Sequence, residues 1–338
     1  MSDNYTAFRK RRRTLVIVEG NHEGHKLFPL LFRCFPEMGI SKEDILIYET
    51  NIYVLYDCIV KEYGQKWDDD DVDLPYVVSK ADGRETLYKE DFINIIMVFD
   101  YERQDPSFSE EKIGRMQRYF ADETDVGKLY LNYPMVEAYK DLRSLPDDSF
   151  ADRTYTAAFS AGGEYKDFVH RNNCVEEFAD FYSDLDGILL EQCGVADETD
   201  RAGCYEKLMI LDSSDGLTDA VEEILTGTLP EERMQTAKNL VRAKIQEAGY
   251  TLAGKTYWSH MRSIFKEIIR HNICKANRIQ NGTFQVAPDR YRECYENIDL
   301  QQILGIQNAA SKDRENGFIW VLATCMFVIP EYNFNLLA

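Results

Sequence analysis

The sequence predicts an α/β protein in which a mainly parallel β-sheet is flanked by helices and followed by a largely helical region. Two apolar runs rich in β-branched residues, Thr14–Val18 and Phe92–Phe99, have the composition of buried strands. Apolar residues between and after these runs recur with the spacing of amphipathic helices. Strands that alternate with helices usually form parallel sheets, because each helix carries the chain back to the start of the next strand.

The composition is that of a globular protein without a membrane span. Hydrophobic residues make up 44% and aromatic residues 12% of the 338 residues. No apolar run approaches the roughly 18 residues needed to cross a bilayer, and the N-terminus lacks the apolar core of a secretion signal. The eight cysteines include no Cys-x-x-Cys pair, which favours reduced thiols over disulfides or a zinc site. We therefore expect a cytoplasmic protein.

Residues 1–145 have the pattern of the α/β domain, with an insertion at about 64–91. The acidic run Asp68–Asp73 within the insertion favours a solvated loop, because like charges repel. The pattern predicts strands at 14–18, 44–48, 92–99 and 128–132, and helices at 24–38, 52–63, 109–121 and from Pro134 onwards.

Residues 146–338 show few strand signals and are expected to be mainly helical. Helical spacing or composition covers 164–170, 175–190, 218–225, 231–248 and 260–276. The run Gly317–Ile329 is almost continuously apolar but too short to span a bilayer. We expect it to be a buried core segment, with contact between subunits of a homo-oligomer as the alternative.

Acidic residues stand where two of the predicted strands end. Glu19 follows the first strand, and Asp100 and Glu102 follow the strand that begins at Phe92. Residues two apart on an extended chain point the same way, so Asp100 and Glu102 are expected to face one point, with Tyr101 turned away. If the strands are parallel neighbours, all three carboxylates meet at one edge of the sheet. Such a cluster is typical of a Mg²⁺ or Mn²⁺ site.

The order of these motifs resembles the Toprim domain, a metal-dependent nucleotidyl-transfer and hydrolase fold. The resemblance covers roughly residues 14–140 and lies in Val18-Glu19-Gly20-x-x-Glu23, followed by Asp100-x-Glu102. This chain has Glu102 where the family usually has aspartate, and its two motifs are farther apart than in minimal Toprim domains. The resemblance implies that Glu19, Asp100 and Glu102 bind Mg²⁺ or Mn²⁺, and that Glu19 or Glu23 acts as a general base.

The layout of the whole chain is similar to stand-alone bacterial anti-phage Toprim proteins. These are the RloB-like proteins and the AriB-like effectors of PARIS systems, in which a helical region follows the Toprim core; the OLD-type Toprim nucleases are a further group that the chain resembles. The resemblance implies a defence nuclease that cleaves RNA, tRNA foremost, rather than DNA. It also implies control by a partner ATPase.

Other residues are candidates for the same chemistry. Glu137, in the first turn of the helix predicted after Pro134, is either a fourth active-site carboxylate or a partner of the helix dipole. His271, Lys275 and Arg278 share one helix face, and either bind the scissile phosphate and donate a proton or pair with surface acids. The basic run Phe8–Arg13 is either a phosphate-contacting arm or a solvated tail.

The formal charge of −20 excludes binding of phosphate backbones through bulk charge, so a nuclease would need a local basic surface, metal or a partner. Two other classes of function stay open. The chain could be a non-catalytic regulatory subunit with a Toprim-like sheet, or a phosphohydrolase of small nucleotides. It contains no P-loop, no Gly-x-Gly-x-x-Gly motif and no Gly-x-Ser-x-Gly elbow, so small-nucleotide chemistry would use the same carboxylates.

Overall fold

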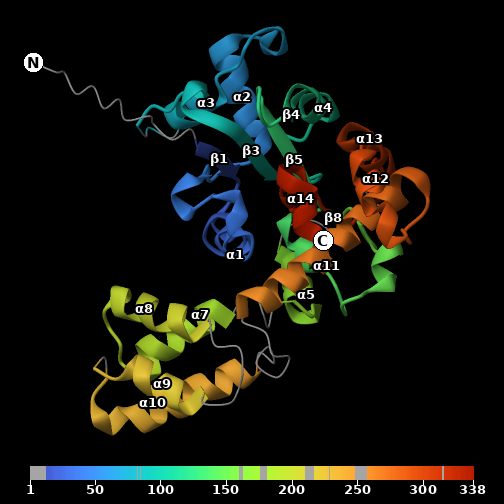
Figure 1. Ribbon diagram of the computed structural model, residues 1–338. Coiled ribbons are helices and arrows are strands. Elements are labelled where there is room, and N and C mark those ends of the chain that lie inside the picture. The colour runs from blue at the N-terminus through green and yellow to red at the C-terminus, as the bar shows by residue number, and fades with distance from the viewer. Residues whose placement is uncertain are drawn as a thin grey trace, which may run out of the picture.

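The protein is built around a six-stranded sheet, which a computed structural model places at the centre of the N-terminal half (Figure 1). The structure describes residues 13–81, 83, 85–159, 163–175, 181–209, 217–227, 229–247, 257–313 and 316–338. The strand order is β2-β1-β3-β5-β4, and β8 also pairs with β5. The strands of this sheet are β1 (Arg13–Val18), β2 (Ile45–Ile47), β3 (Phe92–Asp100), β4 (Ala121–Asp122), β5 (Gly127–Tyr133) and β8 (Leu322–Ala323).

The central four strands are parallel, which confirms the predicted fold class. Strand β1 pairs in parallel with both β2 and β3, and β3 pairs in parallel with β5. Only the short strands β4 and β8 run antiparallel to β5 among the strands described in this sheet. Val18 lies opposite Val98, and Asp100 lies opposite Asn132. The carboxyl ends of β1, β3 and β5 therefore meet at one edge of the sheet.

Helices cover both faces of the sheet. Figure 1 shows α2, α3 and α4 together on one side, and α1 with α11 on the other. The side chain of Asn51 caps α2 by accepting hydrogen bonds from the N–H groups of Tyr53 and Val54. The helices of the first half are α1 (Phe28–Cys34), α2 (Ile52–Tyr63), α3 (Leu74–Ala81) and α4 (Glu110–Tyr119).

Two predicted helices next to the sheet edge differ from expectation. The helix expected at 24–38 begins with a π-helical turn, Glu23–Leu27, and ends with α1 at Cys34. The turn lies close to the sheet, since a Cβ added at Gly24 would lie 2.4 Å from Cγ1 of Ile47. The helix expected after Pro134 is a short 3₁₀ helix, Val136–Lys140. Its first N–H group is bound by the Asp100 carboxylate, which fixes this segment against β3.

The second half is mainly helical, as predicted. Helices α7 to α10 pack on one another and form a group of their own in Figure 1. A two-stranded sheet joins β6 (Thr154–Thr156) to β7 (Phe318–Trp320). The helices are α5 (Gly163–Asn172), α7 (Phe181–Gly187), α8 (Glu198–Met209), α9 (Leu217–Leu225), α10 (Glu231–Glu247), α11 (Tyr257–Asn281), α12 (Tyr291–Glu296), α13 (Leu300–Ala310) and α14 (Val328–Asn333).

The apolar run at 317–329 is largely buried, as expected, and its part from β8 onwards packs against the sheet of the first half. Strand β8 pairs with β5, and the hydroxyl of Thr324 donates a hydrogen bond to the Leu131 carbonyl at 2.8 Å. The N–H group of Cys325 donates to Oδ1 of Asn132 at 3.2 Å. The C-terminal segment thus completes the core that the first 145 residues begin. In the described ranges, no helix has both the length and the apolar character that crossing a membrane requires.

A carboxylate cluster at the sheet edge

The carboxyl ends of β1 and β3 hold Glu19 and Asp100 against each other. The N–H group of Glu19 still bonds to the Val98 carbonyl at 3.1 Å, so the chain leaves β1 in register with β3. Oε2 of Glu19 accepts a hydrogen bond from the Asp100 N–H group at 3.0 Å. Oδ1 of Asp100 in turn accepts one from the Val136 N–H group at 2.8 Å. Backbone N–H groups of β3 and of the segment after β5 thus hold the two carboxylates.

Glu23 and Glu137 approach from the two segments that follow β1 and β5. Both side chains are buried, at 4% and 6% exposure. Gly20 lets Glu23 fold back, because a Cβ at Gly20 would lie only 3.1 Å from Oε2 of Glu23. Oε2 of Glu137 is buried and has no hydrogen-bond partner. An orphaned carboxylate oxygen of this kind is costly unless a cation or water binds it.

Glu102 lies at the rim of this group rather than at its centre. Strand β3 ends at Asp100, and Glu102 has a positive φ of 39°, so the alternation of an extended chain does not continue to it. Tyr101 points away, as predicted, and its hydroxyl donates to Oδ1 of Asn308 at 2.7 Å. The charge of Glu102 still reaches Glu19, whose pKa it helps to raise.

Burial and mutual repulsion weaken the acidity of the cluster. Burial first, and then the Glu102 carboxylate, raise the pKa of Glu19 to about 8. Burial, and then the charges of Glu19, Glu23 and Glu137, raise the pKa of Asp100 well above its usual value. Burial, and then Glu137, raise the pKa of Glu23 in the same way. The pKa of Glu102 is also raised, by burial and then by Asp105. Ionising the whole group therefore requires a compensating positive charge.

Lys166 of α5 supplies such a charge and is a site residue that the sequence did not reveal. Its Nζ lies 3.6 Å from Oε1 of Glu137. Burial alone would lower the pKa of Lys166, but the carboxylates of Glu137, Asp100 and Glu23 outweigh burial and raise it. Lys166 is 29 residues beyond Glu137 in the second half of the chain, and only the packing of α5 brings it here. A lone lysine in a polar helix gives no signal in the sequence.

The donor set of the cluster fits a hard divalent cation. It consists of carboxylate oxygens, which are the ligands that Mg²⁺ and Mn²⁺ prefer, and it includes the orphaned oxygen of Glu137. Glu19, Asp100, Glu23 and Glu137 could hold such an ion, with Glu102 at the rim. As the side chains stand, no three Asp, Glu, His or Cys groups of the described ranges form a ready metal-ligand arrangement. Side-chain rotation would have to precede binding.

His271 and Lys275 are not brought to the cluster. Nε2 of His271 accepts a hydrogen bond from the Asp147 N–H group at 2.9 Å, and Nδ1 contacts the Glu267 carbonyl at 2.7 Å. Nζ of Lys275 donates to the carbonyls of Phe150, Ala151 and Arg153 at 2.8, 3.0 and 2.9 Å. Both side chains are buried and bind residues 147–153. Burial, and then Arg153, lower the pKa of Lys275 to about 7, but its geometry gives it a structural role.

The basic run falls largely outside the described residues. Only Arg13 of Phe8–Arg13 is described, and it forms an ion pair with Asp44 at 3.4 Å. Arg278, on the same helix face as Lys275, pairs with Asp152 at 2.8 Å. Both arginines therefore pair with acids that lie outside the cluster.

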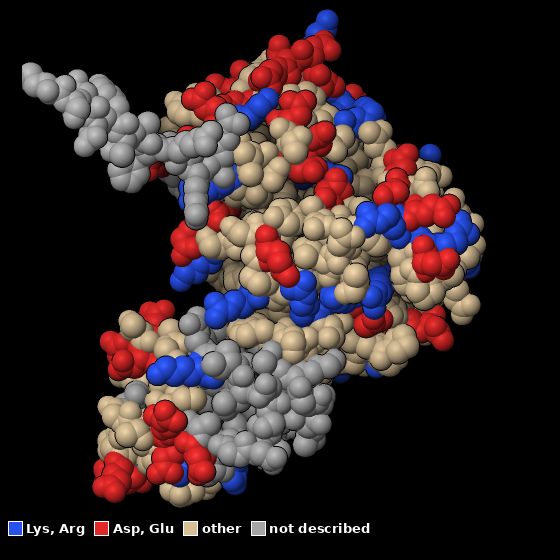
Figure 2. All heavy atoms as spheres, viewed as in Figure 1, with Lys and Arg blue, Asp and Glu red and all other residues tan. Residues whose placement is uncertain are grey.

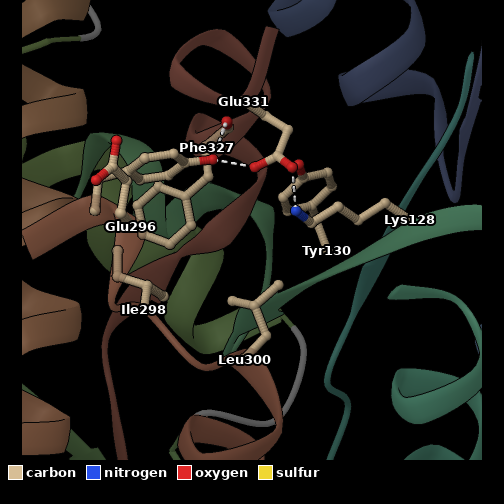
Figure 3. Close-up of a pocket in the computed structure, with 8 residues that line it drawn as sticks. Lys128, Tyr130, Glu296, Ile298, Leu300, Phe327 and Glu331 are labelled. Atoms are coloured by element: carbon tan, nitrogen blue, oxygen red, sulfur yellow. Dashed lines mark hydrogen bonds and ion pairs between the residues drawn. The ribbon is translucent and has the colours of Figure 1, made fainter. Parts of the chain in front are cut away.

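A cavity of about 340 Å³ lies elsewhere, between β5 and the C-terminal helices (Figure 3). Its polar groups satisfy one another, since Glu331 bonds both to Lys128 and to the hydroxyl of Tyr295. None of the five cluster carboxylates lines it. The acidic cluster is therefore the stronger candidate for chemistry.

Comparison of the chain with models of known protein families, with curated proteins and with solved structures finds no match. The candidate function of the chain therefore depends on the chemistry of the carboxylate cluster.

Proposed function

We propose that the protein is a divalent-metal-dependent phosphodiesterase that hydrolyses nucleic acid at the carboxylate cluster. One observation carries the proposal: acidic side chains from two parallel strand ends, and from the segments that follow β1 and β5, converge at the sheet edge where α/β proteins bind ligands. Mg²⁺ or Mn²⁺ bound there would polarise a phosphoryl oxygen and lower the pKa of an attacking water. Glu19 and Asp100 are the principal ligands in this proposal, with Glu23, Glu137 and Glu102 around them.

The chain's own residues would divide the remaining work. Glu19 and Asp100 are held in place by backbone N–H groups and keep their oxygens fixed at the edge. Glu23 lies beside them, and its pKa is raised by burial and then by Glu137, so in its ionised form it would be a stronger base for the proton of an attacking water. Lys166 places an ammonium group next to Glu137, where it can bind a phosphate oxygen of the substrate.

RNA, with tRNA foremost, is the substrate that we favour. This preference, a role in anti-phage defence and control by a partner ATPase rest on the resemblance to the anti-phage Toprim proteins. A local basic surface is present despite the net charge of −20. Figure 2 shows Lys and Arg side chains in a band across the middle of the molecule, where Figure 1 shows α11. Arg262, Lys266 and Arg270 are spaced four apart on this helix, with Arg262 paired to Glu37 at 2.8 Å and Arg270 paired to Glu267.

A second candidate function is that of a non-catalytic regulatory module. The observation that favours it is that no described side chains stand in a ready metal-ligand arrangement. In this case the cluster would keep its protons and its lysine, and the acidic surface would bind a basic partner. Metal binding and cleavage measured on the same protein separate the two candidates.

The test is a cleavage assay on the purified full-length protein. Total tRNA, single-stranded RNA, single- and double-stranded DNA and free nucleotides are each incubated with Mg²⁺, Mn²⁺ or EDTA. We expect metal-dependent cleavage of RNA that falls by about 100-fold or more in Glu19→Gln, because one anionic ligand is lost. Glu19→Gln is expected to stay folded, since it removes a buried charge that its neighbours repel.

Glu90→Gln is the matched control, because Glu90 is exposed just before β3, at the opposite end of that strand from Asp100. It should leave cleavage unchanged. Equal cleavage by wild type and Glu19→Gln would refute the proposed site. Absence of cleavage of any polymer or nucleotide, with or without Mn²⁺ binding, would favour the regulatory module.

A further inference from the structure

Helix α5 is attached to the sheet domain through a small apolar cluster of its own. Tyr165 and Val169 are fully buried against Met135, and these three residues form a group separate from the main core. Hydrogen bonds add to this attachment: the Tyr165 hydroxyl donates to Oδ2 of Asp141 at 3.2 Å, and the Arg143 guanidinium donates to the Asn172 carbonyl. A short helix whose buried residues form a small cluster outside the main core can detach locally without unfolding the rest of the protein.

The same helix presents Lys166 to the carboxylates. Lys166 follows Tyr165 directly, so the residue that anchors α5 also sets the position of the lysine. Its side chain is half exposed, whereas that of Glu137, which it contacts at 3.6 Å, is 8% exposed. The Lys166 side chain therefore reaches the buried carboxylate from the solvent side, and the ammonium group can move into water without crossing the core.

We propose that Lys166 is the resident counter-cation of the carboxylate cluster and competes with a divalent metal ion for it. The two cations need the same oxygens, because Glu137, which Lys166 contacts, is also a member of the candidate metal site. Two positive charges within a few ångströms repel each other in a poorly solvated site. Metal entry then withdraws Lys166 and loosens α5, and anything that holds α5 down keeps the site closed to metal.

This inference deepens the proposed function and rests on its metal site, but it makes a prediction that needs no substrate. It also differs from the role of a phosphate-binding lysine in the loaded enzyme. A lysine that only binds substrate leaves metal affinity unchanged when it is removed. A competing lysine raises metal affinity when it is removed.

The experiment is a Mn²⁺ titration of the full-length protein without substrate, followed by calorimetry or by the electron paramagnetic resonance signal of free Mn²⁺. Lys166→Met should raise the affinity for Mn²⁺ by about tenfold, because a nearby unit charge is removed. Lys80→Met is the matched control. Lys80 lies at the end of α3, and its side chain is 53% exposed, close to the 50% of Lys166. It also forms an ion pair with a glutamate, Glu62 of α2. This control should bind Mn²⁺ as the wild type does.

A second variant tests the attachment of α5 without touching a charge. Val169→Ala removes buried contacts of the helix and should raise Mn²⁺ affinity, although by less than Lys166→Met does. Hydrogen exchange of the α5 backbone should become faster when Mn²⁺ saturates the wild type. Slower exchange on binding would overturn the proposal, because it would mean that metal and α5 support each other.

The outcomes for the lysine and for the enzyme are distinct. Unchanged or weaker Mn²⁺ binding by Lys166→Met overturns the competition, whatever the cleavage assay shows. Stronger binding by this variant without cleavage of any substrate sustains the competition and refutes the proposed phosphodiesterase. If neither the wild type nor Lys166→Met binds Mn²⁺, the competition and the metal site are both refuted.

Discussion

At the scale of single residues, the fold disfavours the ionised form of the cluster carboxylates. Four carboxylates, those of Glu19, Glu23, Asp100 and Glu102, have pKa values raised by burial first and by their neighbours next. Such groups are held because the fold around them is stable, and sites of this kind are frequent where function requires them. The strain has a direct consequence for stability.

Without divalent ions, the stability that depends on Glu19 should fall as the pH rises. The pKa of Glu19 is about 8 in the folded protein, against an ordinary value of 4.5, so the folded state binds more protons than the unfolded state between these values. The free energy of unfolding therefore decreases with pH in this window, and the loss is complete above the folded pKa. The measurement is the midpoint of thermal unfolding in EDTA from about pH 5 to about pH 9.

Glu19→Gln should show a weaker decline over the same range, and Mg²⁺ should restore the wild type at the alkaline end. Glu90→Gln serves as the control and should follow the wild type. Identical pH profiles for the wild type and Glu19→Gln would show that Glu19 is not buried among other carboxylates.

At the scale of elements, helices α5 and α11 show that a basic residue can serve either a site or the fold. Lys166 on α5 contacts a cluster carboxylate, whereas Lys275 on α11 donates hydrogen bonds to three backbone carbonyls. The sequence offered the α11 lysine as a candidate for the site, because His271, Lys275 and Arg278 share one helix face. The shared face is real, but it lies against residues 147–153.

Lys275→Met should therefore lower stability rather than disturb chemistry. It leaves three carbonyl oxygens without a donor in a buried place, and we expect a loss of about 3 kcal/mol in the free energy of unfolding. Urea unfolding measures the loss. Arg278→Met is the control on the same face, where the partly exposed pair with Asp152 should contribute less than about 1 kcal/mol.

Any cleavage activity per folded molecule should be the same in Lys275→Met as in the wild type. A lower turnover number with unchanged stability would instead return Lys275 to the catalytic machinery.

At the scale of the whole molecule, the two halves of the chain share one core. The C-terminal segment adds β8 to β5, and Asn272 of α11 accepts a hydrogen bond from the Ala323 N–H group at 2.8 Å. Asn132 at the end of β5 receives the Cys325 N–H group. The strand pattern of the sequence changes at about residue 145, but residues on both sides of this position pack into the same core.

The fragment 1–145 should not fold cooperatively by itself. Removing the rest exposes one edge of β5 and the apolar surface that α11 and the C-terminal segment cover. Circular dichroism during heating should show no cooperative transition for the fragment, while the full chain shows one. A sharp transition of the fragment would mean that the first half is an independent domain.

The sequence by itself determined the parallel strands, their order along the chain and the place of Glu19 and Asp100 at two strand ends. These features depend on local hydrophobic pattern and on the rule that parallel strands end at one edge. Tertiary structure decided the rest. Glu102 moved to the rim because the chain turns after Asp100, and Glu137 joined the cluster through a 3₁₀ helix instead of an α-helix. Lys166 lies next to the cluster and Lys275 does not, because the packing of distant segments decides which side chains come into contact. The hydrophobic pattern of the sequence does not encode this packing.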